Sequence, residues 1–302
     1  MGVLDRRIAI VTGSGRGIGR DIALYFAKQG ARVVVNDLGG ATDGSGQSPV
    51  ADEVVEEIRK AGGEAVASHD SVATVSGGQA IFQTAIDAFG GLDILVNNAG
   101  ILRDRTLFNM EEEDWDAVLN VHLKGHYCCT RPFARYIRET NRLGCRVINF
   151  SSVSGLFGNF GQANYGAAKA GIAGFSRVVS LELEKYEATV NTISPGAATR
   201  MTIPLIEGRG LAVDTSDPTR GPQQIAPVVT WLASPAGKAV NGEIIHVSRG
   251  TVAIMQQPTL IRTFKSDELW TLDQLDGVIP SLLEAKRVCD ERAAKEATPE
   301  LI

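Results

Sequence analysis

Apolar, β-branched runs alternate with amphipathic segments from the start of the chain to about residue 250. The runs at 7–12, 31–37 and 145–150 are mostly apolar, and segments such as 18–29 show the three-to-four-residue spacing of a helix. Strands that are apolar throughout are covered on both faces, and strands separated by helices pair in parallel. The alternation therefore predicts an α/β fold, a doubly wound parallel sheet, with residues 1–250 as one domain.

Three segments interrupt this alternation. Residues 38–49 are rich in glycine and polar side chains, which predicts a loop after the second strand. Residues 199–222 predict a substrate loop, because a long insertion between a strand and a helix is often an active-site lid. Beyond residue 250 the alternation ends. We expect residues 251–302 to form a C-terminal extension of two short helices that packs near the active site or on a neighbouring subunit.

The composition excludes several classes of protein. A hydrophobic fraction of 44% indicates a globular core, and a formal net charge of −5 offers no basic surface to nucleic acid. The apolar runs are too short to cross a bilayer, and the first residues lead into a strand instead of a signal peptide. The four cysteines and four histidines lack metal-ligand spacing, so we expect reduced cysteines and no metal. These features predict a cytoplasmic protein without membrane insertion.

A cluster of glycines, T-G-S-G-R-G-I-G at 12–19, lies between the first predicted strand and the first predicted helix. Gly13 and Gly17 permit a tight turn and a close approach of the backbone to a pyrophosphate, and Gly19 lets the helix pack on the sheet. The helix N-terminus offers N–H groups and a partial positive charge to the same anion. This context predicts a Rossmann-type dinucleotide site that also includes Arg16 and Ile18.

The identity of the dinucleotide depends on Asp37, which ends the second predicted strand. A carboxylate there accepts hydrogen bonds from the adenosine ribose and repels a 2′-phosphate. Arg16 opposes this preference, because a cation beside the second glycine can reach a 2′-phosphate. Neither Asn36 nor Leu38 adds a compensating positive charge, so we expect NAD as the cofactor.

Polar residues follow two further predicted strands. Asp70 ends the third strand, and the run N-N-A-G at 97–100 ends the fourth. Ligands of open α/β sheets bind beyond the carboxyl ends of the strands, although a helix cap and a turn would explain the same residues. These positions extend the predicted cofactor site to Asp70, Ser71, Asn98, Ala99 and Gly100.

Tyr165 precedes Lys169 by four positions in a predicted helix. Side chains at i and i+4 share one helix face, so the lysine ammonium can act on the phenol and favour the phenolate. A phenol pKa lowered from about 10 towards neutrality would make Tyr165 an acid/base catalyst. The spacing also occurs by chance in many helices, so the neighbouring motifs must decide.

Five motifs occur in order along residues 5 to about 250: T-G-x-x-x-G-x-G, N-N-A-G, a serine thirteen residues before Tyr165, Y-x-x-x-K, and a P-G pair after the sixth strand. The set resembles the short-chain dehydrogenase/reductase family. The resemblance implies that Tyr165 is the acid/base, that Lys169 lowers its pKa and holds the nicotinamide ribose, and that Ser152, not its neighbours Ser151 or Ser154, binds the substrate oxygen. It also implies cofactor contacts for Tyr165, Lys169, Pro195, Gly196 and Thr199.

His122 departs from the family pattern. Many members carry an asparagine in the helix before the fifth strand, where it supports a water relay to the lysine, and this chain has V-H-L-K-G. The ring N–H of His122 could perform the same relay, or the histidine could be a packed substitute. Both interpretations stay open.

Longer stretches narrow the resemblance: V-V-V-N-D-L-G-G, N-N-A-G-I-L-R-D-R, W-D-A-V-L-N-V-H-L-K-G and G-N-F-G-Q-A-N-Y. They are similar to the (3R)-hydroxyacyl-CoA dehydrogenase part of peroxisomal multifunctional β-oxidation enzymes, a subgroup that uses NAD and includes 17β-hydroxysteroid-active members. The resemblance implies an NAD-dependent dehydrogenase of (3R)-hydroxyacyl-CoA or steroid alcohols. It also implies a homodimer or homotetramer built through the helices on either side of the fifth strand.

Two alternatives remain. An NADPH-dependent 3-oxoacyl reductase is favoured by G-Q-A-N-Y and Arg16 and opposed by Asp37, and cofactor preference separates it from the first interpretation. A catalytically silent NAD-binding scaffold on the same fold is opposed by the complete set of Ser152, Tyr165 and Lys169.

Overall fold

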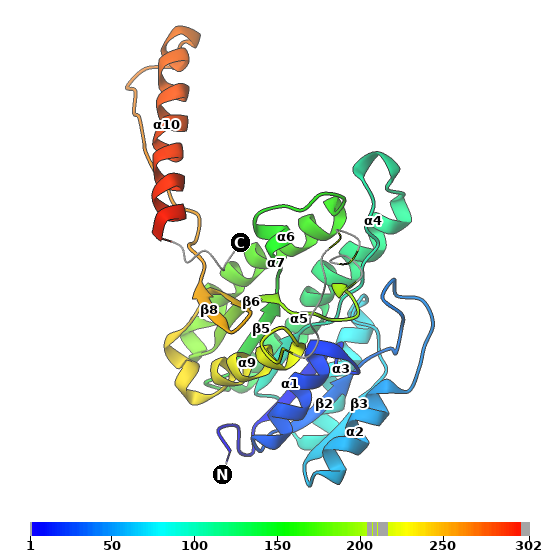
Figure 1. Cartoon of the computed structure of the whole chain (residues 1–302). Helices are drawn as coiled ribbons and strands as arrows, with labels where there is room; N and C mark the ends of the chain where they lie inside the picture. Colours follow the sequence, from blue (N-terminus) through cyan, green and yellow to red (C-terminus); the bar gives the residue numbers. More distant parts are fainter. Residues whose placement is uncertain (1, 204–206, 208–209, 211–216, 297–302) are drawn as a thin grey trace. The chain divides into compact units, whose positions relative to one another are not determined.

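The computed structural model describes the chain except for residues 1, 204–206, 208–209, 211–216 and 297–302. It contains two compact units, Met1–Met255 and Gln256–Ile302, whose elements are labelled in Figure 1. The predicted substrate loop, 199–222, lies partly outside the described residues. None of the helices within the described ranges combines the length and the apolar character that a membrane span requires.

The first unit is built on a sheet of eight strands. These are β1 (Ile8–Thr12), β2 (Arg32–Asn36), β3 (Glu64–Ser68), β4 (Ile94–Asn97), β5 (Arg146–Phe150), β6 (Thr189–Gly196), β7 (Ile244–Ser248) and β8 (Thr251–Ile254). Their order is β3-β2-β1-β4-β5-β6-β7-β8; the first seven pair in parallel, and β8 runs antiparallel to β7. The predicted doubly wound parallel sheet is therefore confirmed. The chain reverses direction across the sheet between β1 and β4, which is where such folds bind ligands.

Helices connect the strands and cover both faces of the sheet. They are α1 (Gly17–Lys28), α2 (Val50–Lys60), α3 (Val75–Phe89), α4 (Glu112–Leu119), α5 (Gly125–Thr140), α6 (Val153–Leu156), α7 (Ala163–Leu183) and α9 (Ile225–Ala233). A π-helical segment, Asn120–Lys124, joins α4 to α5.

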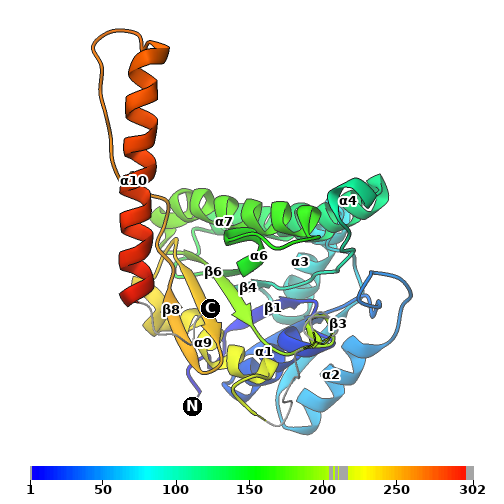
Figure 2. The same ribbon diagram turned by 45° about the horizontal axis from the view of Figure 1, so that its top comes forward.

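Two apolar layers hold the helices on the sheet. Ile22, Ala23 and Phe26 of α1 join residues of α2 and α9 in the layer on one face. On the other face, Ile81 of α3 and Phe133 of α5 join residues of α7. The strands lie between α7 and α1 in Figure 2. Because successive strand residues contribute to opposite layers, the strands are buried on both sides, as their apolar runs predict.

The end of the first unit and the second unit differ from expectation. Residues 251–254 extend the sheet as β8, where we expected the start of the extension. The expected pair of short helices is a single helix, α10 (Leu272–Glu296), which continues through Pro280. Ion pairs at helical spacing after the proline, Arg287 with Glu284 and Glu291 and Lys286 with Asp290, support the helix although Pro280 lacks an N–H donor.

Candidate active site

The glycine loop between β1 and α1 requires glycine at three positions. Gly13 and Gly17 have φ angles of 63° and 56°, in the left-handed region that side chains disfavour. A Cβ on Gly19 would lie 2.2 Å from the carbonyl oxygen of Gly13 and 2.5 Å from the amide nitrogen of Asn98. The loop therefore presents bare backbone at the start of α1, which suits the close approach of a pyrophosphate.

Asn98 ties the end of β4 to this loop. Its Nδ2 donates to the carbonyl oxygens of Thr12 at 3.0 Å and Gly13 at 2.9 Å. The hydroxyl oxygen of Thr12 in turn accepts from the backbone N–H groups of Asn98 and Ala99. The N-N-A-G run is thus not only a turn, because the side-chain amide of Asn98 fixes the loop that we assign to the dinucleotide.

Asp37 lies at the end of β2 beside the same loop. Its Oδ2 accepts from the N–H of Gly15 at 2.8 Å, and its Oδ1 accepts from the N–H of Gly39 at 2.7 Å. Two arginines meet close by at the carbonyl oxygen of Gly40, with Arg16 at 3.2 Å and Arg200 at 3.4 Å. The carboxylate is therefore fixed in direction and flanked by two cations.

These segments enclose a cleft of about 200 Å³ beyond the carboxyl ends of β1, β2 and β4. Of the predicted cofactor residues, the cleft is lined by Gly13, Arg16, Gly17, Ile18, Asp37, Asp70, Ser71, Asn98, Ala99, Gly100 and Thr199. The predicted Gly19, Tyr165, Lys169, Pro195 and Gly196 do not line it. Lining residues that sequence reasoning missed are Asn36, Leu38, Gly40, Ala41, Gly44, Val72, Ile101, Val121, Arg200 and Met201. Several of these belong to the 38–49 loop, whose glycine content was the available signal.

Pro195 and Gly196 form the end of β6. A Cβ on Gly196 would lie 2.3 Å from the hydroxyl oxygen of Ser248 on β7, so this position needs glycine for the two strand ends to pack. Beyond it, the N–H of Thr199 donates to the hydroxyl of Thr202 at 2.8 Å.

Ser152, Tyr165 and Lys169 come together at the carboxyl end of β5. Ser152 follows β5 as the N-cap of α6, and its side chain hydrogen-bonds to Tyr165 in the first turn of α7. Lys169 lies one turn later, with its Nζ 5.4 Å from the centroid of the Tyr165 ring and 2.7 Å from the carbonyl oxygen of Phe150. Ser151 instead donates to the carbonyl oxygen of Lys169 at 2.8 Å. Of these two adjacent serines, it is Ser152 whose hydroxyl meets the phenol.

Burial is the largest influence on the pKa values of Tyr165 and Lys169. It raises the pKa of Tyr165 to about 12, against the lowering effect of the Ser152 hydrogen bond. Burial also lowers the pKa of Lys169 to about 7. The predicted fall in the pKa of Tyr165 towards neutrality is therefore wrong for the chain taken alone, because desolvation of the phenolate outweighs its neighbours.

His122 lies against the trio from the π-helical segment. Its ring meets the Tyr165 ring edge-on, with 5.1 Å between centroids, and burial lowers its pKa well below the ordinary value. The neutral ring places Nε2 2.8 Å from the carbonyl oxygen of Ile101, while Nδ1 is buried without a hydrogen-bond partner among the described residues. A Cβ on Gly100 would lie 2.3 Å from this ring, so the glycine of N-N-A-G makes room for the histidine. The relay role of His122 stays a prediction.

Potential metal ligands do not gather in the part of the chain that the structure describes: no group of three or more His, Cys, Asp or Glu side chains is placed to hold an ion. Cys128, Cys129 and Cys145 are buried, and burial raises the pKa of Cys129 and of Cys145 to about 12. These thiols therefore pack as small apolar groups.

Comparison with known proteins identifies the family. A profile described as short chain dehydrogenase matches residues 7–209. The chain is 41% identical over 274 residues to "Hydroxyacyl-CoA dehydrogenase ChsB1" of Mycobacterium tuberculosis, covering 87% of this chain and 84% of the relative. It is 42% identical to "Peroxisomal multifunctional enzyme type 2" of Drosophila melanogaster, covering 99% of this chain but only 48% of that protein.

A solved structure supports the same assignment. A short chain dehydrogenase from Mycobacterium avium superposes with a TM-score of 0.83 at 43% identity, covering 94% of this chain and 97% of that one. The profile, the relatives and the fold agree that the chain is an oxidoreductase acting on CH–OH groups. The chain belongs to the short-chain dehydrogenase family.

Proposed function

We propose that this oxidoreductase transfers a hydride between NAD and the secondary alcohol of a (3R)-hydroxyacyl-CoA or of a steroid. The observation on which the proposal depends is the meeting of Ser152, Tyr165 and Lys169 at the end of β5, in the same unit as a glycine loop with Asp37 beside it. The named hydroxyacyl-CoA dehydrogenase relative supports the substrate class. The test is NAD-linked oxidation of such alcohols, with the Tyr165→Phe variant as the blank.

In the proposed mechanism, Tyr165 takes the hydroxyl proton of the alcohol during oxidation and returns it during reduction. Ser152, already hydrogen-bonded to the phenol, donates to the substrate oxygen as negative charge develops there. Lys169 places its Nζ 5.4 Å from the centroid of the Tyr165 ring and would hold the nicotinamide ribose when NAD is bound. NAD, when bound across the glycine loop, supplies the hydride acceptor and a positive ring that favours the phenolate.

The burial of Tyr165 predicts how the rates of oxidation and reduction change with pH. Because burial raises the pKa of Tyr165 to about 12, the phenol stays protonated at neutral pH. Oxidation requires the phenolate and should become faster as pH rises towards this pKa, whereas reduction requires the phenol and should slow only as pH approaches it.

Asp37 supports NAD over NADP in this proposal. Its carboxylate is held by two N–H groups at the end of β2, where a ribose 2′-phosphate would meet a fixed negative charge. Arg16 and Arg200 favour the alternative, a 3-oxoacyl reductase that uses NADPH. Both arginines, however, donate to the carbonyl oxygen of Gly40, so part of their donor capacity is already used.

The Asp37→Ser variant should lose its preference for NAD. We expect kcat/KM for NAD to fall roughly 10- to 100-fold, because a charge-assisted hydrogen bond to the ribose is lost, and kcat/KM for NADP to rise. Initial rates with both cofactors measure the change, and Arg16→Ala is the matched variant. A parent enzyme that prefers NADP, and loses this preference in Arg16→Ala, would instead support the oxoacyl reductase.

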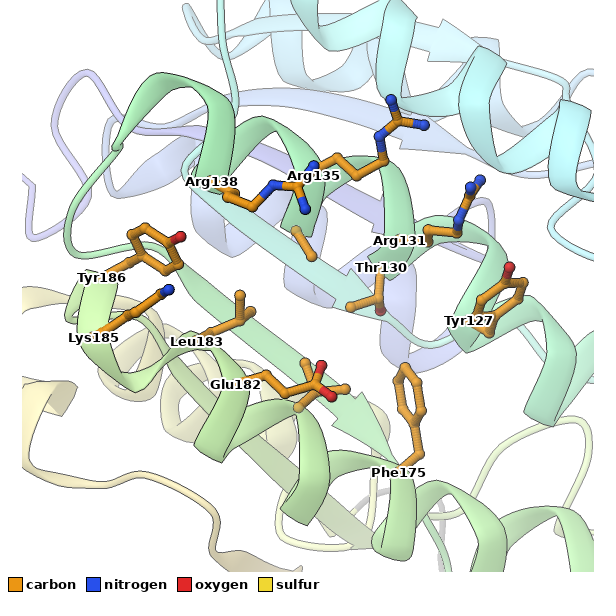
Figure 3. A pocket seen from close by; sticks show the side chains of 12 residues that line it. Tyr127, Thr130, Arg131, Arg135, Arg138, Phe175, Glu182, Leu183, Lys185 and Tyr186 are labelled. Atoms are coloured by element: carbon orange, nitrogen blue, oxygen red, sulfur yellow. The ribbon is translucent and has the colours of Figure 1, made fainter.

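We also propose that the enzyme is a homo-oligomer that associates through α5 and α7. A cavity of about 330 Å³ lies between these helices, lined by apolar side chains, by four basic side chains and by Glu182 (Figure 3). The basic side chains are Arg131, Arg135, Arg138 and Lys185, and the apolar ones include Phe175, Val179 and Leu183. Nearby on α7, Val178 and Leu181 are 55% and 73% exposed, so they add apolar surface beside the cavity that a partner could cover.

The Val178→Glu variant should therefore shift the enzyme from a dimer or tetramer to a monomer. A buried, unpaired carboxylate at the interface would cost several kcal/mol of association energy. Light scattering after size-exclusion chromatography measures the mass, and Val3→Glu, at a 56% exposed position on the N-terminal segment, is the control. A monomeric parent, or an unchanged mass in Val178→Glu, would contradict this assembly.

A cytoplasmic location of the protein stays a prediction.

A further inference from the structure

The segment that precedes the catalytic helix is fastened to the loop after β4 by a set of contacts. Gln162, the residue before α7, forms an isolated parallel bridge with Arg105, and its Nε2 donates to Oδ2 of Asp104 at 2.6 Å. Asn164 donates from Nδ2 to the carbonyl oxygen of Arg103 at 2.9 Å. We call this set of contacts, between residues 103–105 and 162–164, the clasp.

The clasp also holds the first turn of α7, which carries Tyr165. The carbonyl oxygen of Gln162 accepts from the N–H of Gly166 at 2.7 Å, and Oδ1 of the fully buried Asn164 accepts from the N–H of Tyr165, also at 2.7 Å. The side chain of Gln162 is fixed from its other end by Nδ2 of Asn159 at 2.8 Å. A movement of Gln162 would therefore move the first turn of α7 and the phenol that it carries.

Asp104 is the one acidic residue of the clasp, and one of its oxygens has no stabilising contact. Oδ1 is buried and lacks a hydrogen-bond partner among the described residues, whereas Oδ2 binds Gln162. A buried carboxylate oxygen without a partner is costly, so its presence in the clasp calls for an explanation.

Asp104 also acts on the phenol electrostatically. Burial is the largest cause of the raised pKa of Tyr165, and the charge of Asp104 adds to it; burial also raises the pKa of Asp104 itself. The other groups that face Tyr165 are Ser152 after β5, Lys169 on the same helix and His122 on the π-helical segment, and the pKa of His122 is lowered by burial. Asp104 is thus the acidic group that opposes ionisation of the phenol.

We propose that Asp104 is a positioning residue of the reaction: through Gln162 it fixes the first turn of α7, and it places a carboxylate beside the segment that carries the Tyr165 phenol. This inference depends on the proposed acid/base role of Tyr165. It goes beyond the serine, tyrosine and lysine set, because it adds a carboxylate that does not line the cofactor cleft.

The Asp104→Asn variant removes the negative charge of this side chain while keeping almost the same shape. Its amide oxygen can still accept from Gln162, so the clasp persists while the negative charge disappears. For alcohol oxidation, the phenolate then forms more readily, and the rising limb of the kcat/KM profile should move to lower pH. Asp116→Asn, which removes an exposed carboxylate of α4, is the control and should leave the profile in place.

The positional part is tested by breaking the hydrogen bond from either side. Asp104→Ala and Gln162→Ala should each lower kcat roughly tenfold, with KM for NAD unchanged, because the phenol is misplaced and the cofactor cleft is not. If Asp104 acts through Gln162, the double variant should lose no more than either single one. Circular dichroism and thermal melting confirm folding, and if Asp104→Ala does not fold, Gln162→Leu replaces it as the test of the bridge.

The outcomes separate this inference from the proposed function. A pH profile of Asp104→Asn that coincides with the parent, or additive losses in the double variant, overturns the inference. If the Tyr165→Phe variant keeps the activity of the parent, the proposed function is rejected, and the role of Asp104 is rejected with it. An inactive Tyr165→Phe together with an unshifted Asp104→Asn leaves the proposed function standing and rejects only the role of Asp104.

Discussion

Replacing Tyr165 by phenylalanine is expected to lower kcat for alcohol oxidation about 1,000-fold while leaving NAD binding unchanged. The phenol oxygen is the group that exchanges a proton with the substrate, and the ring without it fills the same space against His122. Stopped or initial-rate assays of NADH formation measure kcat, and quenching of protein fluorescence measures NAD binding. The hydroxyl also hydrogen-bonds to Ser152, so its loss leaves that serine without this partner.

The matched control is Tyr25→Phe. Tyr25 lies on α1 and packs against the apolar layer on the opposite face of the sheet from Tyr165. It should keep the activity of the parent enzyme. A Tyr165→Phe variant with more than a tenth of the parent kcat would remove the phenol from the chemistry and leave the motif as a structural feature of α7.

Replacing Lys169 by methionine is expected to lower kcat/KM about 100-fold and to raise KM for NAD. The Nζ of Lys169 is buried, donates to the carbonyl oxygen of Phe150 and lies over the Tyr165 ring. Methionine keeps the length and apolar stem but supplies neither charge nor donor. Unchanged kinetics in Lys169→Met would contradict the role of the lysine in both cofactor binding and proton transfer.

The same variant tests the ionisation of Lys169 through stability. Burial lowers the pKa of Lys169 to about 7 in the folded protein, against about 10.4 in an unfolded chain. Between these values the unfolded chain binds more protons, so the free energy of unfolding of the parent rises with pH. From pH 7 to pH 9 we expect the parent to gain about 2 kcal/mol relative to Lys169→Met, measured by denaturant unfolding without cofactor. If the free energies of unfolding of the two proteins change in parallel with pH, the pKa of Lys169 is not shifted.

The sheet was predictable because its signal is local. Each strand from β1 to β7 is a short run with apolar residues next to a helical pattern, so the type of each element and its place along the chain follow from periodicity. The antiparallel β8 and the single helix α10 were not predictable in this way. β8 is half exposed and short, and α10 contains Pro280, so both lack the pattern that a buried element shows.

The sequence predicts those parts of the candidate site in which the role of a residue follows from local backbone space or from helix spacing. The glycines of the loop and the pairing of Tyr165 with Lys169 follow from backbone space and helix spacing. The clasp of Asp104 and Gln162 joins residues 58 positions apart, and the meeting of Arg16 and Arg200 at Gly40 joins residues still more distant. Such contacts depend on how loops fold over the sheet, which periodicity does not encode. The pKa of Tyr165 was mispredicted for a related reason, since spacing shows the neighbouring lysine but not the burial.

The most direct test of the account is the initial rate of oxidation with NAD and with NADP on matched panels of 3-hydroxyacyl-CoA thioesters and 17β-hydroxysteroids, with Tyr165→Phe as the blank. The account predicts NAD-linked oxidation of one of these classes that disappears in the variant. A clear preference for NADP would show that Arg16 and Arg200 outweigh Asp37 and that the enzyme is an oxoacyl reductase. Absence of turnover on both panels with either cofactor would contradict the proposed dehydrogenase.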